Sequence, residues 1–254
     1  MIKKIEQFLK RYYITIIIFL GLIFLYYLMS AVWKVNPYLF PQMSTIGQSF
    51  EENKELMFVN LKSSFRLMVP SIIISLTIAL VLGTVLGLNE KVRDALYPIL
   101  YAFSVIPSIL LSPFVLFSAP NFVVASIILI VYGTLWSTLF ATITGIMTID
   151  SRYLDKAATL ELTGIKKLFK VILPAASPSI LSGFVNSLRS TFIMLVYSEM
   201  YGAQYGMGYF VKKYSEFGMF QNVWSGFIFM VVVLIIVMQF FECLKKRILR
   251  WTMN

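Results

Sequence analysis

Six long apolar runs are the feature of this 254-residue sequence that most restricts its fold. A helix of about 20 apolar residues is long enough to cross the hydrocarbon core of a bilayer. Since lipid offers no partners for backbone N–H and C=O groups, a chain with several such runs is confined to α-helices. The sequence therefore predicts a single all-α transmembrane domain over residues 1–254. The runs lie at about 13–31, 66–88, 96–117, 121–146, 175–200 and 223–243.

The first run has two interpretations. Basic residues precede it, as they precede the apolar core of a secretory signal peptide. The apolar core of a signal peptide has about 7–15 residues, whereas this run is longer and rich in Ile, Phe and Leu. We therefore expect a retained membrane span, with cleavage near Ala31 as the alternative.

The distribution of Lys and Arg predicts the orientation of the spans. With the N-terminus inside, fifteen of the 22 basic residues lie on the cytoplasmic face and six on the outer face. Cytoplasmic loops are the ones enriched in Lys and Arg, so both termini are expected to be cytoplasmic. Anionic lipid headgroups account for the net charge of +10, and no nucleic-acid partner is expected. The inner residues are Lys3, Lys4, Lys10, Arg11, Lys91, Arg93, Arg152, Lys156, Lys166, Lys167, Lys170, Lys245, Lys246, Arg247 and Arg250.

The residue types in the chain exclude several kinds of chemistry. There is no histidine and one cysteine, Cys243. This composition excludes a disulfide framework and a His/Cys metal site. The phosphate-binding pattern G-x-x-x-x-G-K-[ST] is also missing from the sequence. We therefore expect no catalytic residue, no metal and no cofactor in this chain.

A charged segment between the fourth and fifth runs predicts a helical hairpin. Asp150 or Ser151 can cap a helix start, and small or apolar residues then recur at helical spacing as far as Gly164, a plausible stop. Three lysines follow before Leu173-Pro174, where the proline is expected to turn the chain into the fifth span. Such a hairpin can dock a partner or lie unpartnered on the lipid surface.

The sequence of this hairpin, DKAATLELTGIKKLFKVILP, resembles a signature of ABC importer permeases. The signature is E-A-A, three residues, G, nine residues and I-x-L-P. Counting back from Pro174 places Asp155 at the leading glutamate, Glu161 at the glycine and Val171 at the isoleucine. The continuation LPAASPSILSGFVNSLRSTFIMLVYSEM and the stretch YGAQYGMGYFV are similar to the nitrate/sulfonate/taurine group of these permeases. The similarity covers roughly residues 60–245.

This resemblance implies a six-helix type I importer domain with a cytoplasmic coupling helix at about 151–165, in the bacterial plasma membrane. It implies cytoplasmic ATPase subunits that hydrolyse ATP, an extracytoplasmic solute-binding protein, and a second copy or a related permease. The solute would be a small organic or inorganic anion, such as a sulfonate, or a vitamin precursor. Residues implied to contact the ATPase are Asp155, Lys156, Ala157, Leu160, Glu161, Leu162, Thr163 and Gly164.

Two positions of the signature depart from the family pattern. Lys156 replaces an alanine, and Glu161 replaces the glycine that permits a tight turn. We expect the turn to shift toward Gly164 and the docking geometry to differ at the substituted positions. The F-G-x-G element expected after the third span is replaced by residues 117–120, FSAP.

Polar residues within the fifth run are candidates for the transport path. Arg189 with Asn186 and Ser190 could bind an oxyanion, because a guanidinium binds such groups through two parallel hydrogen bonds. The alternative is that Arg189 bonds to carbonyls or to an acidic residue within the bundle. Glu199 is expected to be structural and to meet Arg66 near the outer end.

Two other functional classes stay open for a chain of this composition. An ion-coupled secondary carrier would need buried acids near mid-membrane. A polytopic membrane enzyme would need a catalytic cluster at the interface, and the acids there, Asp150, Asp155 and Glu161, are interleaved with lysines.

Overall fold

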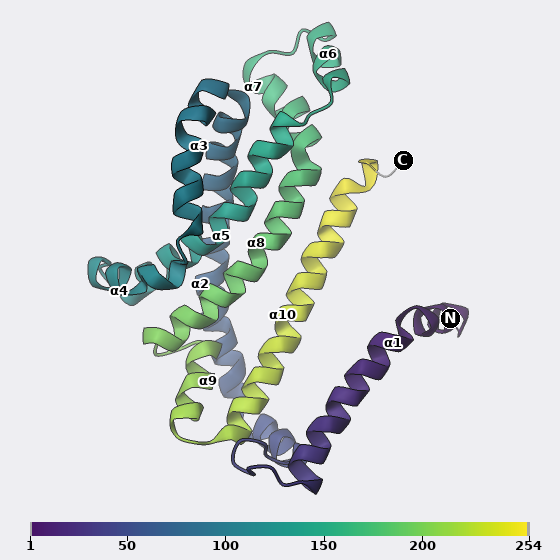
Figure 1. Cartoon of the computed structure of the whole chain (residues 1–254), viewed down its shortest axis with the longest axis vertical. Coiled ribbons are helices and arrows are strands. Elements are labelled where there is room, and N and C mark those ends of the chain that lie inside the picture. The colour runs from purple at the N-terminus through teal and green to yellow at the C-terminus, as the bar shows by residue number, and fades with distance from the viewer. Residues whose placement is uncertain (1, 253–254) are drawn as a thin grey trace. The chain divides into compact units, whose positions relative to one another are not determined.

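The computed structural model describes the backbone of residues 2–252 and the side chains of residues 13–250. Every regular element in this described part is helical (Figure 1). The chain divides into two compact units. Unit 1 comprises Met1–Phe58 and Phe210–Phe229, and unit 2 comprises Val59–Tyr209 and Met230–Asn254. The expectation of one domain stays a prediction.

The helices follow the apolar runs of the sequence. The first five are α1 (Ile2–Tyr27), α2 (Met43–Leu88), α3 (Glu90–Val105), α4 (Ser108–Ser118) and α5 (Phe122–Met147). The next five are α6 (Ser151–Thr159), α7 (Gly164–Lys167), α8 (Leu173–Gly202), α9 (Met207–Glu216) and α10 (Phe220–Ile248). π-Helical turns occupy Leu28–Val32 and Leu168–Ile172, and a 3-10 turn occupies Leu249–Thr252.

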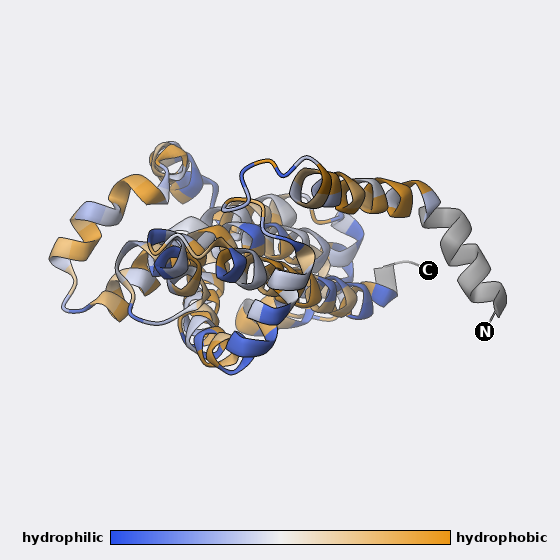
Figure 2. Ribbon diagram, turned by 90° about the horizontal axis from the view of Figure 1, so that it is seen from below, coloured by the Kyte–Doolittle hydropathy of each residue, from blue (hydrophilic) through white to orange (hydrophobic). Residues whose placement is uncertain are grey.

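In the part of the chain that the structure describes, five helical segments are long and apolar enough to cross a membrane, or six if α3 and α4 together form one span. The long segments are Tyr13–Val32, Met43–Leu88, Phe122–Met147, Gly164–Gly202 and Phe220–Ile248. Figure 2 shows the described part of α1 as mostly hydrophobic. The side chains of α1 are largely exposed, as expected of a helix that faces lipid.

The run expected as a third span at 96–117 consists of two helices that meet at 91°. Pro107 causes the break. A proline disfavours helical geometry in the residue before it, and Ile106 is extended, with φ −72° and ψ 117°. Pro107 then occupies the position before α4, where its missing N–H costs no helical hydrogen bond.

Close contact between α5 and α8 forms the centre of unit 2. Small residues allow the two backbones to approach, as is common between membrane helices. A Cβ added to Gly183 would overlap Ala141 and lie 2.6 Å from the carbonyl oxygen of Ser137, and one on Gly145 would lie 2.8 Å from Ser179. This pair of helices therefore has no free volume along its contact line.

Hydroxyl groups also join α5 to α8. The side-chain oxygens of Thr134 and Thr191 lie 2.9 Å apart, and the Thr138 hydroxyl donates to Ser187 at 3.2 Å. All four residues are buried. Hydrogen bonds of this kind contribute about 0.6 kcal/mol each between membrane helices.

Unit 1 contains polar contacts between the starts of α2 and α10. The Ser49 hydroxyl donates to the Asn222 side chain at 2.8 Å and lies 3.0 Å from the Ser225 hydroxyl. The Trp224 indole N–H donates to the Leu39 carbonyl at 2.8 Å. The first two contacts satisfy the buried polar side chains of Ser49, Asn222 and Ser225.

Gly183→Ala should destabilise the folded bundle by about 1–3 kcal/mol, because the added methyl forces α5 and α8 apart. Gly47→Ala is the matched control, since nothing lies within 4 Å of a Cβ at that helical position. Thermal unfolding of the purified variants in detergent measures the difference. Equal midpoints for the two variants would contradict the close α5–α8 contact.

Candidate functional site

The hairpin between α5 and α8 begins at a capped helix. The Asp150 carboxylate accepts the Arg152 backbone N–H at 2.9 Å, as predicted for the first residue before α6. The Arg152 guanidinium also pairs with it at 2.6 Å. The hydrogen bond from Arg152 lowers the pKa of Asp150 to about 2. The cap therefore stays ionised at neutral pH and is lost only as the pH falls toward that value.

The C-terminal end of α6 has an unusual residue in its turn. The Leu162 N–H donates to the Ala157 carbonyl and the Glu161 N–H to the Ala158 carbonyl, both at 2.9 Å. This pair of bonds defines a Schellman motif, in which the residue after the cap adopts a left-handed conformation and is usually glycine. Glu161 occupies this position with φ +50°.

The turn therefore differs from the one expected from the sequence. Helix α6 stops before Leu160 and not at Gly164, because the Schellman bonds close at Glu161 and Leu162. Gly164 also has a left-handed φ, +53°, but it starts α7. The left-handed conformation therefore occurs at the glycine position of the signature, although Glu161 occupies that position.

Leu173 and Pro174 do not form the turn into α8 that we expected. The segment Gly164–Gly202 runs as one helical stretch of 39 residues, and Pro174 lies in the first turn of α8. A proline is tolerated there, and the π-helical turn Leu168–Ile172 directly before it accommodates the altered hydrogen bonding. The change of direction lies at 160–163.

Large apolar side chains are exposed on this charged hairpin. Leu160, Ile165 and Phe169 are 69%, 76% and 64% exposed. A hollow of about 260 Å³ lies between α6 and the start of α8, and Lys156 and Lys170 line it. Exposed apolar groups of this size suit either a surface that binds another protein or one that lies on lipid.

One face of α8 is polar and exposed. Asn186 and Arg189 are three residues apart, so they share this face, and Ser190 beside them is half-buried. Among the described residues, no hydrogen bond or ion pair to Arg189 is found, so the alternative partners within the bundle are not observed. The opposite face packs on α5 through Ser187 and Thr191.

Glu199 is fully buried, and the described residues show no ion pair between it and Arg66. Its carboxylate instead accepts the Gly208 backbone N–H at 2.8 Å. The expected contact with Arg66 was therefore wrong. Two residues of α2, Asn60 and Ser64, complete this cluster, and they could not be predicted because they are distant in sequence. The two closely spaced glycines at 206 and 208 were the feature of the sequence that indicated a close contact.

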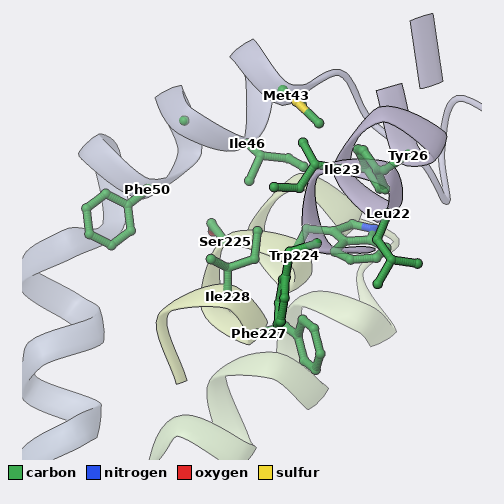
Figure 3. Close-up of a pocket in the computed structure, with 12 residues that line it drawn as sticks. Leu22, Ile23, Tyr26, Met43, Ile46, Phe50, Trp224, Ser225, Phe227 and Ile228 are labelled. Atoms are coloured by element: carbon green, nitrogen blue, oxygen red, sulfur yellow. The ribbon is translucent and has the colours of Figure 1, made fainter. Parts of the chain in front are cut away.

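Each unit contains a large apolar cavity. One, of about 700 Å³ in unit 1, is lined by residues of α1, α2 and α10, including Tyr26, Trp224 and Phe227 (Figure 3). The other, of about 730 Å³ in unit 2, lies between α2, α8 and α10. Neither is lined by a charged residue, and among the described residues no cluster could hold a metal ion.

Comparison with known proteins assigns the fold to a family. The model of the family described as "Binding-protein-dependent transport system inner membrane component" matches residues 71–253. The chain therefore belongs to this family of membrane proteins. It is a multi-pass permease subunit of an ABC importer in the inner membrane, and ATP hydrolysis belongs to a separate subunit.

Named relatives support this assignment. SsuC of Bacillus subtilis (strain 168), a permease protein whose name assigns it to aliphatic sulfonates transport, is 27% identical over 87% of this chain and 83% of its own. The formylaminopyrimidine transport permease protein ThiX of Halalkalibacterium halodurans is 23% identical over 74% of this chain and 79% of its own. The nitrate import permease protein NrtB of Leptolyngbya laminosa is 24% identical over 61% and 56%.

A solved structure shows the same fold. A chain of the MetNI methionine ABC transporter superposes on 78% of this chain and 98% of its own, with a TM-score of 0.68 and 17% sequence identity. The expected all-α importer fold is confirmed.

Glu161→Gly should stabilise the hairpin by about 1 kcal/mol, because glycine adopts the left-handed conformation without a Cβ penalty. Hydrogen exchange should then slow about fivefold at the amides of residues 161 and 162. Gly164→Ala is the opposite control, since its φ of +53° is unfavourable for alanine in otherwise open space. Faster exchange in the Glu161→Gly protein would show that the turn is not strained.

Proposed function

We propose that this permease forms one half of a path through which a small anion, or a vitamin precursor, enters the cytoplasm by alternating access. The polar face of α8 is the observation that carries the proposal. An arginine at mid-membrane depth costs at least about 2.5–3.5 kcal/mol when it faces lipid. Arg189 lies near the middle of α8 and is exposed in the single chain. Its face must therefore be covered by a second subunit or line a water-filled path.

Arg189, with Asn186 and Ser190, is the proposed solute contact. A guanidinium binds sulfonate, carboxylate or nitrate oxygens through two parallel hydrogen bonds, and a nearby amide and hydroxyl can complete the contact. The relatives named for aliphatic sulfonates and nitrate support an anionic solute. The relative named for formylaminopyrimidine supports a vitamin precursor as the other candidate.

A second copy of this chain, or a related permease, is the proposed cover for this face. Two α8 helices placed around one axis would bring two polar faces to a shared path, and lipid would then contact only apolar helices. Closed two-fold assemblies are the commonest arrangement of soluble oligomers, and the same self-complementary contact applies here.

Both termini are proposed to be cytoplasmic. The Lys and Arg count favours this orientation. Within unit 2, the start of α3, the hairpin α6–α7 and the end of α10 lie toward the same end in Figure 1, and each of them carries Lys and Arg residues. This grouping agrees with one basic face at the cytoplasmic side.

The hairpin is the proposed docking element for the ATPase subunit. Its two short helices expose Leu160 and Ile165 at the tip, beside the strained turn at Glu161. A groove in the ATPase could enclose these apolar groups, and the hairpin would then move with it as a rigid body. The remaining proposed contacts are Asp155, Lys156, Ala157, Leu162, Thr163 and Gly164. The extracytoplasmic solute-binding protein would dock at the opposite end of α8.

Leu160→Asp and Ile165→Asp should each weaken association with the ATPase subunit about tenfold or more, because a charge replaces an apolar anchor. Thr159→Asp is the matched control, since it adds the same charge at a neighbouring exposed position without removing apolar surface. Co-purification and ATP hydrolysis of the reconstituted complex provide the measurements. Normal association of both leucine and isoleucine variants would refute docking through the hairpin.

Arg189→Ala should lower uptake of the anionic substrate about tenfold or more, while Arg189→Lys should retain part of it because the charge stays. Vesicles carrying the complete transporter would be assayed with nitrate, an alkanesulfonate and a formylaminopyrimidine. Selective loss of anion uptake supports the proposed contact. Unchanged uptake of the transported anion in Arg189→Ala would remove this residue from the path.

A further inference from the structure

Three consecutive backbone N–H groups in the short turn after α8 donate hydrogen bonds to buried side chains. The Gly206 N–H donates to the Asn60 side-chain oxygen at 2.9 Å. The Met207 N–H donates to the Ser64 hydroxyl at 3.0 Å, and the Gly208 N–H donates to the Glu199 carboxylate at 2.8 Å. We name these three bonds the turn clamp. They join α2, α8 and the start of α9, and all the residues belong to unit 2.

Glu199 is the most deeply buried side chain of the turn clamp. It is 0% exposed, against 2% for Ser64 and 3% for Asn60. The second carboxylate oxygen, Oε1, is buried without a hydrogen-bond partner. A carboxyl group held in this way is costly to bury, which points to a role beyond filling space.

The two glycines allow the turn to lie directly on Glu199. A Cβ on Gly206 would overlap the Glu199 carboxyl group, and Gly206 also has a left-handed φ of +119°. A Cβ on Gly208 would lie 2.8 Å from the Glu199 Cβ. Any side chain at either position would therefore separate the turn from α8.

The turn clamp and the hairpin lie at opposite ends of the same helix. α8 has 30 residues, which gives a length of about 45 Å. Its first residue follows the π-helical turn that leads from the hairpin, and Glu199 lies in its last turn. Above the buried clamp residues, Gln204 and Tyr205 are exposed on the turn.

We infer that Glu199 is a positioning residue that makes the turn 203–208 move with α8 as one body. Resting on the proposed function, this assigns the exposed turn as a contact surface for the solute-binding protein. A displacement of the hairpin by the ATPase is then passed along α8 to that surface, and docking on the turn is passed back. Without the turn clamp, the turn 203–208 would move independently of α8.

Hydrogen exchange of the permease in lipid nanodiscs tests the turn clamp by itself. Glu199→Ala should speed exchange at the amides of residues 206–208 about tenfold, and Ser64→Ala should do so to a smaller extent. Glu199→Gln keeps the shape and one acceptor oxygen, so its exchange should stay close to wild type. Glu242→Ala removes a carboxylate of α10 in the same unit and is the control. Unchanged exchange in Glu199→Ala overturns the turn clamp.

ATP hydrolysis by the reconstituted transporter tests the transmission. With the solute-binding protein and its solute added, stimulated hydrolysis should fall about tenfold in Glu199→Ala, while basal hydrolysis and ATPase association stay normal. Ser64→Ala, which changes little volume, should show a smaller loss and guards against misfolding of the first variant. Full stimulation of ATP hydrolysis in a variant whose residues 206–208 exchange faster than in the wild type overturns the role of Glu199.

The same assay separates this inference from the proposed function. If Leu160→Asp and Ile165→Asp both bind the ATPase normally while Glu199→Ala still loses stimulation, docking through the hairpin fails and the role of Glu199 in holding the turn stands. If Leu160→Asp loses association and Glu199→Ala keeps full stimulation, the proposed function stands and the role of Glu199 fails.

Discussion

The close packing of α5 on α8 is the constraint on which unit 2 depends. Gly145 and Gly183 leave no room for a side chain, and two hydroxyl pairs fix the register of the contact. Because one face of α8 packs on α5, the direction of the opposite face is fixed as well. That face presents Asn186 and Arg189, so the packing that stabilises the bundle also positions its charged group.

α8 connects the features that matter for transport. The hairpin precedes it, the polar face lies along it, and Glu199 binds the turn that follows it. Small residues and two hydrogen bonds hold α8 closely against α5, whereas the hairpin has a left-handed residue at Glu161. A continuous helix with a proposed protein-binding element at each end is suited to pass movement between an ATPase and a solute-binding protein.

The sequence predicted the helices well because apolar runs and capping residues are local signals. Asp150, one of the two residues expected as a cap, caps α6, and the six runs correspond to helices. The angle at Pro107 was harder to predict, because a proline in a span indicates a kink without giving its size. The observed bend is 91°. The hairpin turn was misplaced, since a left-handed glutamate is not expected from propensity. Glu199 was misassigned because its partners on α2 are distant in sequence.

Water access to the polar face of α8 shows whether this face lines a transport path. In a Cys243→Ala background, Asn186→Cys would be assembled with the ATPase in vesicles and labelled with a membrane-impermeant, charged thiol reagent from each side. The account predicts labelling from one side without nucleotide and from the other in an ATP-bound, hydrolysis-arrested complex. Ile193→Cys on the same face should follow the same pattern. No labelling from either side, or labelling unaffected by nucleotide, would contradict a path along this face.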